Sequence, residues 1–357
     1  MFPFHIDDPS FAEFQRNWSA PPNHGTTILF SSHTFRTDRY HRCPPVQFYT
    51  LNFEENRAGK LLQAKRVGHL DRGWLKDRRS VSFAKDGICF FNKHSELMVF
   101  DLASGQLTSL PKTPSSGFSS AFLGYDGVSG TYKVSKAVSN GFPFRRTVKY
   151  WVFTLGVDEA WREIESPVLL SLGRRFINGV CINGVIYSYN VLRSDPWETL
   201  AGCSEVVAFD VGSESFHQIP LPPATYGKDV KKSSLLEISG RFAVINVHQD
   251  KQFIVWTLET AAKSPSLWKR RDVPFPLEEE ILEAGSEFFS NTSITATSAG
   301  EIVLLFMRTG ILSLWVLSDS VWKKFRIEGI AECPTCVKKH FEVLVAQNIA
   351  ENLFHLE

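Results

Sequence analysis

The sequence predicts an all-β fold, a six-bladed β-propeller of four-stranded antiparallel blades. One phrase recurs five times: an apolar segment, a glycine turn, a second apolar segment, a third segment centred on an aromatic residue, and a closing segment that mostly carries Trp or Phe. A period of a few tens of residues is typical of stacked or radial repeats, and four-stranded sheets repeated radially are propeller blades. The turn glycines lie 43 to 60 residues apart, at Gly87, Gly130, Gly184, Gly240 and Gly300.

Each repeat supplies four strands. The strand before the glycine is predicted at 81–84, 121–125, 180–182, 235–238 and 294–297. The glycine then allows a tight hairpin, because it reaches positive φ without a Cβ clash. Short segments rich in β-branched or aromatic residues follow at 88–91, 185–189, 241–245 and 301–305. The third strands are predicted at 97–101, 150–154, 206–210, 253–257 and 314–317, and the fourth at 107–111, 161–164, 216–220, 268–270 and 322–325.

A propeller must also close, because an open sheet edge invites aggregation. Residues 27–30, 47–51 and 61–67 provide three further strands without a first one. The C-terminal segment 341–346 can supply it, so we predict that the first blade combines both ends of the chain. Seven blades are the alternative, because residues 52–80 are too weakly patterned to exclude another strand pair.

Composition agrees with one globular body inside the cell. The formal net charge of +1 gives no global field that would attract nucleic acid or an anionic membrane, so nucleic-acid binding is not favoured. The longest apolar run, 302–307, is far shorter than a spanning helix needs. Asp7 and Asp8 interrupt the N-terminus, which lacks the apolar core of a signal peptide. We therefore expect a cytoplasmic or nuclear protein without a membrane partner.

Residues for catalysis, cofactors or metals are sparse, so we predict a non-enzymatic protein with no cofactor and no metal. Cys333 and Cys336 form a single CxxC pair, and with His340 they give at most three zinc ligands. A plain loop is favoured there, with a metal or redox role as the alternative. His217 and His248 stand apart in sequence, and only the fold could bring them to a carboxylate.

Partner binding is predicted on the face that carries the long loops. In an up-and-down blade, the loops between the second and third strands and the links between blades lie opposite the short hairpin turns. This set includes the long segments 32–45, 140–146, 190–203, 220–233 and 273–293. Long loops on a rigid scaffold usually carry function. They contain aromatic and arginine side chains, which anchor protein interfaces. The predicted partner-binding residues are Arg39, Tyr40, Arg42, Phe144, Arg145, Arg146, Arg193 and Trp197.

Several segments together resemble one family. Gly124-Tyr125-Asp126 and Tyr132-Lys133-Val134 resemble the GYD and YKV signature of the F-box-associated propeller domains of plants. Further segments follow in that family's order: 161–162, 181–187, 207–210 and 216–220. The resemblance covers roughly residues 26–330. It implies a substrate-recognition subunit of an SCF-type cullin-RING ubiquitin ligase, in which the propeller holds the target protein and an F-box docks the Skp-family adaptor.

The N-terminus departs from that family's pattern. Asp8-Pro9-Ser10-Phe11 resembles the junction that follows the F-box, but seven residues before Asp8 are too few for a three-helix docking module. This argues against adaptor and cullin binding by this chain. We expect residues 1–25 to be a remnant of the junction with a short helix and linker, and residues 26–357 to form the propeller. The alternative function is a stand-alone protein-interaction propeller that is not attached to a ligase.

Overall fold

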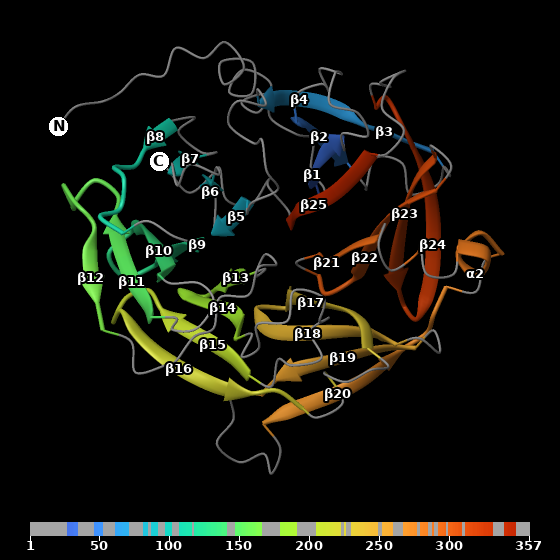
Figure 1. Cartoon of the computed structure of the whole chain (residues 1–357). Coiled ribbons are helices and arrows are strands. Elements are labelled where there is room, and N and C mark those ends of the chain that lie inside the picture. Colours follow the sequence, from blue (N-terminus) through green and yellow to red (C-terminus); the bar gives the residue numbers. More distant parts are fainter. Residues whose placement is uncertain are drawn as a thin grey trace. The chain divides into compact units, whose positions relative to one another are not determined.

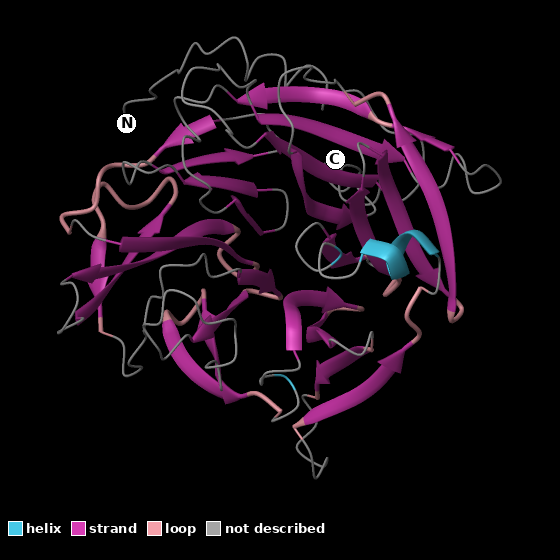
Figure 2. Ribbon diagram, turned by 45° about the vertical axis from the view of Figure 1, so that its right-hand side comes forward, coloured by secondary structure: helices cyan, strands magenta, loops and turns pink. Residues whose placement is uncertain are grey.

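The computed structural model describes most of the predicted repeats. The described residues are 27–34, 46–52, 61–70, 81–84, 87–91, 97–101, 107–115, 118–140, 147–165, 179–190, 205–222, 225, 230–248, 252–259, 267–276, 279–284, 288, 292–297, 299–308, 311–330 and 339–347. Strands account for nearly all of their regular structure (Figure 2). The chain divides into two compact units, one holding most of residues 76–273 and the other residues 6–75, 237–239 and 274–357.

Four antiparallel sheets make up the first unit, and each follows its repeat in chain order (Figure 1). The first sheet contains β5 (Val81–Ala84), β6 (Gly87–Phe91), β7 (Leu97–Asp101) and β8 (Leu107–Ser109). The second contains β9 (Phe118–Asp126), β10 (Thr131–Asn140), β11 (Thr147–Thr154) and β12 (Arg162–Ile164). The third contains β13 (Gly179–Ile182), β14 (Val185–Asn190), β15 (Glu205–Asp210) and β16 (Ser215–Pro220). The fourth contains β17 (Val230–Ile238), β18 (Arg241–His248), β19 (Phe253–Leu258) and β20 (Trp268–Val273).

Two sheets and a short helix make up the second unit. One sheet has the order β25-β1-β2-β4, from β25 (Lys339–Gln347), β1 (Thr27–Thr34), β2 (Val46–Asn52) and β4 (Lys65–Leu70). The other has the order β21-β22-β23-β24-β3, from β21 (Thr292–Ala296), β22 (Ile302–Arg308), β23 (Ile311–Ser318), β24 (Val321–Glu328) and β3 (Leu61–Gln63). The helix is α2 (Glu279–Ala284).

The predicted all-β fold of four-stranded antiparallel sheets is confirmed, and so is the pairing of the two chain ends. β25 pairs with β1 in antiparallel register from Thr27 opposite Gln347 to Thr34 opposite Lys339. The described residues form six sheets. The choice between six and seven blades stays a prediction, because residues 53–60 and 71–80 lie outside the described part.

Two segments differ from the prediction. The third N-terminal strand, predicted at 61–67, serves two sheets: β3 runs parallel to β24, whereas β4 begins only two residues after β3 and pairs with β2. Buried Leu62 and Ala64 explain the split, because they pack with Phe325 and Ile327 in one apolar cluster. The second difference is α2, since the predicted segments include no helix after residue 25. Ile281 and Ala284 are buried, so burial of these two apolar side chains stabilises the short helix.

Neighbouring sheets of the first unit pack closely because glycine stands where their inner strands converge. A Cβ atom on Gly124 of β9 would lie 2.4 Å from a methyl carbon of Val211, and one on Gly179 of β13 would lie 2.5 Å from the ring of Phe122. Around this contact Val152, Ile186, Phe209 and Val211 form a buried apolar cluster. The interface therefore has no room for a side chain at either glycine.

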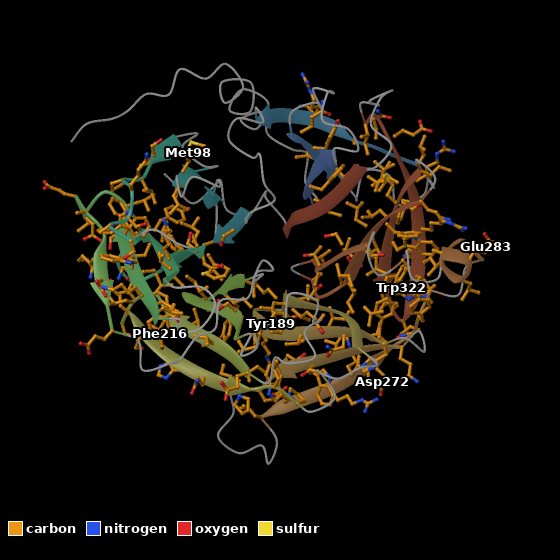
Figure 3. All side chains as sticks on the ribbon, in the orientation of Figure 1. Met98, Tyr189, Phe216, Asp272, Glu283 and Trp322 are labelled. Carbon is orange, nitrogen blue, oxygen red and sulfur yellow. The ribbon has the colours of Figure 1, made fainter. Side chains whose placement is uncertain are left out.

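An indole hydrogen bond recurs at the outer strands. The Nε1 atom of Trp161 donates to the carbonyl of Pro111 at 2.6 Å, that of Trp268 to Pro220 at 2.8 Å, and that of Trp322 to Pro274 at 2.7 Å. Each tryptophan lies at or next to the start of an outer strand, and each proline lies at or just after the end of another. In β16 the matching position is Phe216 (labelled with Trp322 in Figure 3), which packs on Tyr150 with ring centroids 4.7 Å apart. A ring fits this position with or without the hydrogen bond.

We predict that Trp161→Phe lowers the free energy of unfolding by about 1 to 2 kcal/mol, because the Pro111 carbonyl loses its donor in a partly buried site. Trp151→Phe is the matched control in the same sheet. Trp151 is equally buried, and its Nε1 has no hydrogen-bond partner within the described residues. Urea denaturation would measure both variants. Equal losses would show that the hydrogen bond adds nothing beyond the size of the ring.

Candidate functional site

In the first unit, the short hairpin turns of three sheets lie at one common end. The Nδ2 atom of Asn183, in the β13–β14 turn, donates to the carbonyl of Gly240, in the β17–β18 turn, at 2.9 Å. The Nζ atom of Lys133, near the start of β10, lies 2.9 Å from Glu214, in the β15–β16 turn. These cross-sheet contacts fix the short-turn end, so the loops between second and third strands leave from the opposite end.

Strand pairs hold the bases of those long loops. Asn140 pairs with Thr147 at the base of loop 141–146, and Asn190 pairs with Glu205 at the base of loop 191–204. In the second unit, Ser32 pairs with Gln47 close to the base of loop 35–45. All eight predicted partner-binding residues lie in these loops, outside the described residues: Arg39, Tyr40, Arg42, Phe144, Arg145, Arg146, Arg193 and Trp197. Their role stays a prediction.

The GYD and YKV segments lie at the junction between two sheets, close to the short-turn end. Gly124 packs under Val211, and the rings of Tyr125 and Tyr132 contact each other with centroids 5.0 Å apart. Asp126 accepts hydrogen bonds from the Ser129 hydroxyl at 2.6 Å and from the Val128 amide at 2.9 Å. These bonds hold the pKa of the Asp126 carboxyl below its ordinary value. The segments therefore shape a turn and a sheet interface.

A charged cluster joins the same two sheets, and we call Lys133, Asp158, Arg162 and Glu214 the Glu214 cluster. Arg162 of β12 donates to both carboxylate oxygens of Glu214, at 2.8 and 3.0 Å. Lys133 of β10 adds a third contact at 2.9 Å. Arg162 also reaches Asp158 at 3.2 Å. Glu214 lies in the β15–β16 turn, and its backbone φ of 55° falls in the left-handed region.

These contacts shift the pKa values of Glu214, Arg162 and Asp158. Hydrogen bonds from Arg162 and, less strongly, from Lys133 lower the pKa of Glu214 although burial opposes them. The hydrogen bond to Glu214 raises the pKa of Arg162 above its already high ordinary value. Burial alone would raise the pKa of Asp158, but the Thr154 amide and Arg162 hold it lower than usual. Glu214, Arg162 and Asp158 therefore remain ionised at neutral pH.

Sequence reasoning missed the Glu214 cluster. Its members come from two repeats and are separated by up to 81 residues, so no local pattern marks them. It also missed two exposed valines at the short-turn end of the β9–β12 sheet. Val128 is 99% exposed and Val157 is 67% exposed. The sequence does place an apolar valine within each of these two short turns, and this was the available signal for their exposure.

The residues considered in the sequence for metal binding lie apart or outside the described part of the chain. No cluster of three or more His, Cys, Asp or Glu side chains with metal-binding geometry occurs among the residues described. The Nε2 atom of His217 lies 3.4 Å from the Ser215 hydroxyl, and the His248 amide donates to the Gln252 carbonyl at 2.9 Å. Cys333 and Cys336 lie outside the described residues. None of the helices described is long and apolar enough to cross a membrane.

Comparison with protein families gives one match that spans most of the chain. The model of the F-box associated beta propeller domain matches residues 46–345. An F-box protein of Arabidopsis thaliana is 27% identical over 273 residues, which cover 74% of this chain and 60% of that protein. F-box only protein 12 of the same plant is 28% identical over 201 residues, or 54% of this chain and 45% of that protein. The chain thus spans about 60% or less of the length of these relatives.

Solved structures show weaker likenesses. A mutant of Aleuria aurantia lectin in complex with Fucα1-6GlcNAc has a TM-score of 0.41 at 9% identity, covering 86% of this chain and 97% of the lectin. YCF48 from Cyanidioschyzon merolae has a TM-score of 0.42 at 9% identity, covering 85% and 86% of the two chains. With TM-scores under 0.5, these likenesses support no inference about function.

We predict that Glu214→Gln lowers the free energy of unfolding by about 1 to 2 kcal/mol at pH 7, because Arg162 and Lys133 lose an ionised acceptor. The folded-state pKa of Glu214 is lowered. Its stabilisation is therefore complete above the ordinary Glu pKa of about 4.3 and is lost as the pH falls through the lower folded value. The difference between wild type and variant should shrink as the pH falls below about 4.3.

Glu163→Gln is the control for this prediction. Glu163 pairs with Lys149 at 2.7 Å, but both side chains are more than 40% exposed. An exposed pair contributes about 0.5 kcal/mol or less. Chemical denaturation at several pH values would compare the variants. A loss at Glu214 that does not change with pH would contradict an electrostatic role for this carboxylate.

Proposed function

Since the chain belongs to the F-box associated beta propeller family, we propose that it is the target-binding component of an SCF-type cullin-RING ubiquitin ligase and acts in protein ubiquitination. The family match over residues 46–345 is the observation that carries this proposal. The relatives reported above, which are named as F-box proteins, add support. In this role the propeller, residues 26–357, binds the target without covalent chemistry, and the protein works in the cytoplasm or nucleus.

The target is proposed to bind at the long-loop end. Strand pairs such as Asn140 with Thr147 give each loop a fixed base, which is the arrangement that favours selective binding by variable loops. The loops carry arginine and aromatic side chains, and arginine forms two parallel hydrogen bonds with a carboxylate. We therefore propose an acidic protein surface as the partner.

Association with the ligase can be tested by co-precipitating the tagged chain with a Skp-family adaptor and a cullin, beside a version that carries an intact F-box joined before Asp8. The F-box version is the positive control, because the F-box is the docking element of the family. Recovery of the adaptor and cullin with the unmodified chain is the result that the proposal predicts. Recovery with the F-box version alone would leave a stand-alone interaction propeller and overturn the proposal.

Target binding gives a separate prediction. The triple variant Arg145→Ala, Arg146→Ala, Trp197→Ala should reduce recovery of acidic proteins at least tenfold. Truncating an anchor residue of these types often costs about 2 kcal/mol or more of binding free energy. Its melting temperature should stay within about 2 °C of wild type, because the proposal assigns these side chains to the partner and not to the packing of the sheets. Arg241→Ala is the control, since Arg241 is exposed at the opposite, short-turn end. Quantitative mass spectrometry of the recovered proteins would decide, and unchanged recovery would remove these residues from the partner face.

A further inference from the structure

Two outer strands of the structure can be aligned residue by residue. Trp268 in β20 and Trp322 in β24 make the same hydrogen bond to a proline carbonyl, so they mark equivalent positions. The next residue in both strands is lysine. Three residues after each tryptophan, Arg271 in β20 corresponds to Phe325 in β24. The two strands therefore have the same place in their sheets, but β20 has a charged residue where β24 has an apolar one.

The outer edge of β24 binds an added strand of the same chain. β3 lies parallel to β24, with Leu62 opposite Ile327, and the Ala64 amide donates to the Glu328 carbonyl at 2.8 Å. Leu62 is completely buried and packs with Phe325 and Ile327. A Cβ atom on Gly329 would lie 2.6 Å from the Ala64 carbonyl, so the added segment is in close contact with the backbone. An outer strand of this fold can thus accept a further strand when side chains match.

The outer edge of β20 is charged and, in the described part of the chain, uncovered. β20 ends its sheet, and the four residues between Trp268 and Val273 are exposed. Arg270 lies over the ring of Trp256 and pairs with Asp272, which Figure 3 labels on this strand, at 2.7 Å. Neither Lys269 nor Arg271 forms an ion pair with any residue that the structure describes. These two side chains lie on one face of the strand because their positions differ by two.

From this we propose that β20 is a docking edge for an extended acidic segment of a partner protein, which adds to the β17–β20 sheet as a fifth strand. Alternate residues of an edge strand direct their N–H and C=O groups outward, and these would pair with the incoming backbone. Glu or Asp at every second position of the segment would meet Lys269 and Arg271. In registers that keep the Lys269 and Arg271 faces of both strands together, a second copy of β20 would bring cations against cations, which disfavours self-pairing. This site is independent of the long-loop surface proposed above.

Binding of the acetylated, amidated peptide Thr-Glu-Val-Glu-Thr-Glu to the whole chain would test the proposal by isothermal titration calorimetry. The variant Lys269→Glu, Arg271→Glu should weaken binding at least tenfold. The variant Lys323→Glu, Arg326→Glu changes the charge equally on β24, whose edge already holds β3. It should bind the peptide like wild type. Equal weakening by both variants would mean that the peptide responds only to net charge, and the proposal would be wrong.

A second measurement on the unmodified protein separates strand addition from simple charge attraction. The same peptide with N-methyl groups on alternate residues keeps its charge but loses outward hydrogen-bond donors. We expect it to bind at least tenfold more weakly, and we expect the unmethylated peptide to slow amide hydrogen exchange in residues 268–273. Equal affinity of the two peptides, or unchanged exchange in β20, would overturn the docking-edge assignment even if Lys269 and Arg271 matter for affinity.

Discussion

Close packing between neighbouring sheets is the constraint on which the first unit depends. A four-stranded sheet has two faces, and an isolated sheet would leave the apolar side chains of both faces in water, which is unfavourable. Each sheet must therefore lie against the next, and the inner strands approach most closely. Gly124 and Gly179 make that approach possible because any side chain there would overlap Val211 or Phe122. The buried cluster around Val152 and Phe209 then fills the space between the two sheets.

Polar links have a different part in this arrangement. The indole bond from Trp161 to Pro111 and the charged contacts of Glu214 lie at the margins of the apolar interfaces, where partial exposure limits the contribution of each. They are directional, however, whereas apolar contact is not. We infer that apolar packing supplies most of the stability of the first unit and that these bonds fix how far one sheet can slide or rotate against its neighbour. A fixed sheet in turn gives fixed bases to the loops at the opposite end.

Local patterns were enough to predict the strands, because glycine turns and β-branched runs act within a few residues. The pairing of β25 with β1 was also predicted, since the first predicted blade lacked one strand. Three features could not be derived in this way. The segment that divides into β3 and β4 depends on where Leu62 finds an apolar neighbour, and the Glu214 cluster depends on contacts between two repeats. The turn at Asp319 and Ser320 contains no glycine, yet both residues have positive φ, because the hairpin register of β23 and β24 imposes it. For the partner surface, the sequence predicts the loops, and the structure describes the strands that flank them. All eight predicted side chains lie outside the described residues.

The two units also differ in how their strands are brought together. Every sheet of the first unit is a series of hairpins within one repeat, whereas the β25–β1 pair joins strands from almost opposite ends of the chain. Loop-closure entropy grows only logarithmically, so a loop about six times longer than a repeat costs about 1.6 kcal/mol more to close. A nine-residue strand such as β25 can offset this through its backbone pairing with β1. During synthesis, however, that sheet cannot be completed until residue 347 is available, whereas the sheets that hold loops 141–146 and 191–204 need no later part of the chain to form their hairpins. The sheets that flank loops 141–146 and 191–204 are therefore built from local contacts, whereas the sheet that flanks loop 35–45 needs strands from both ends of the chain.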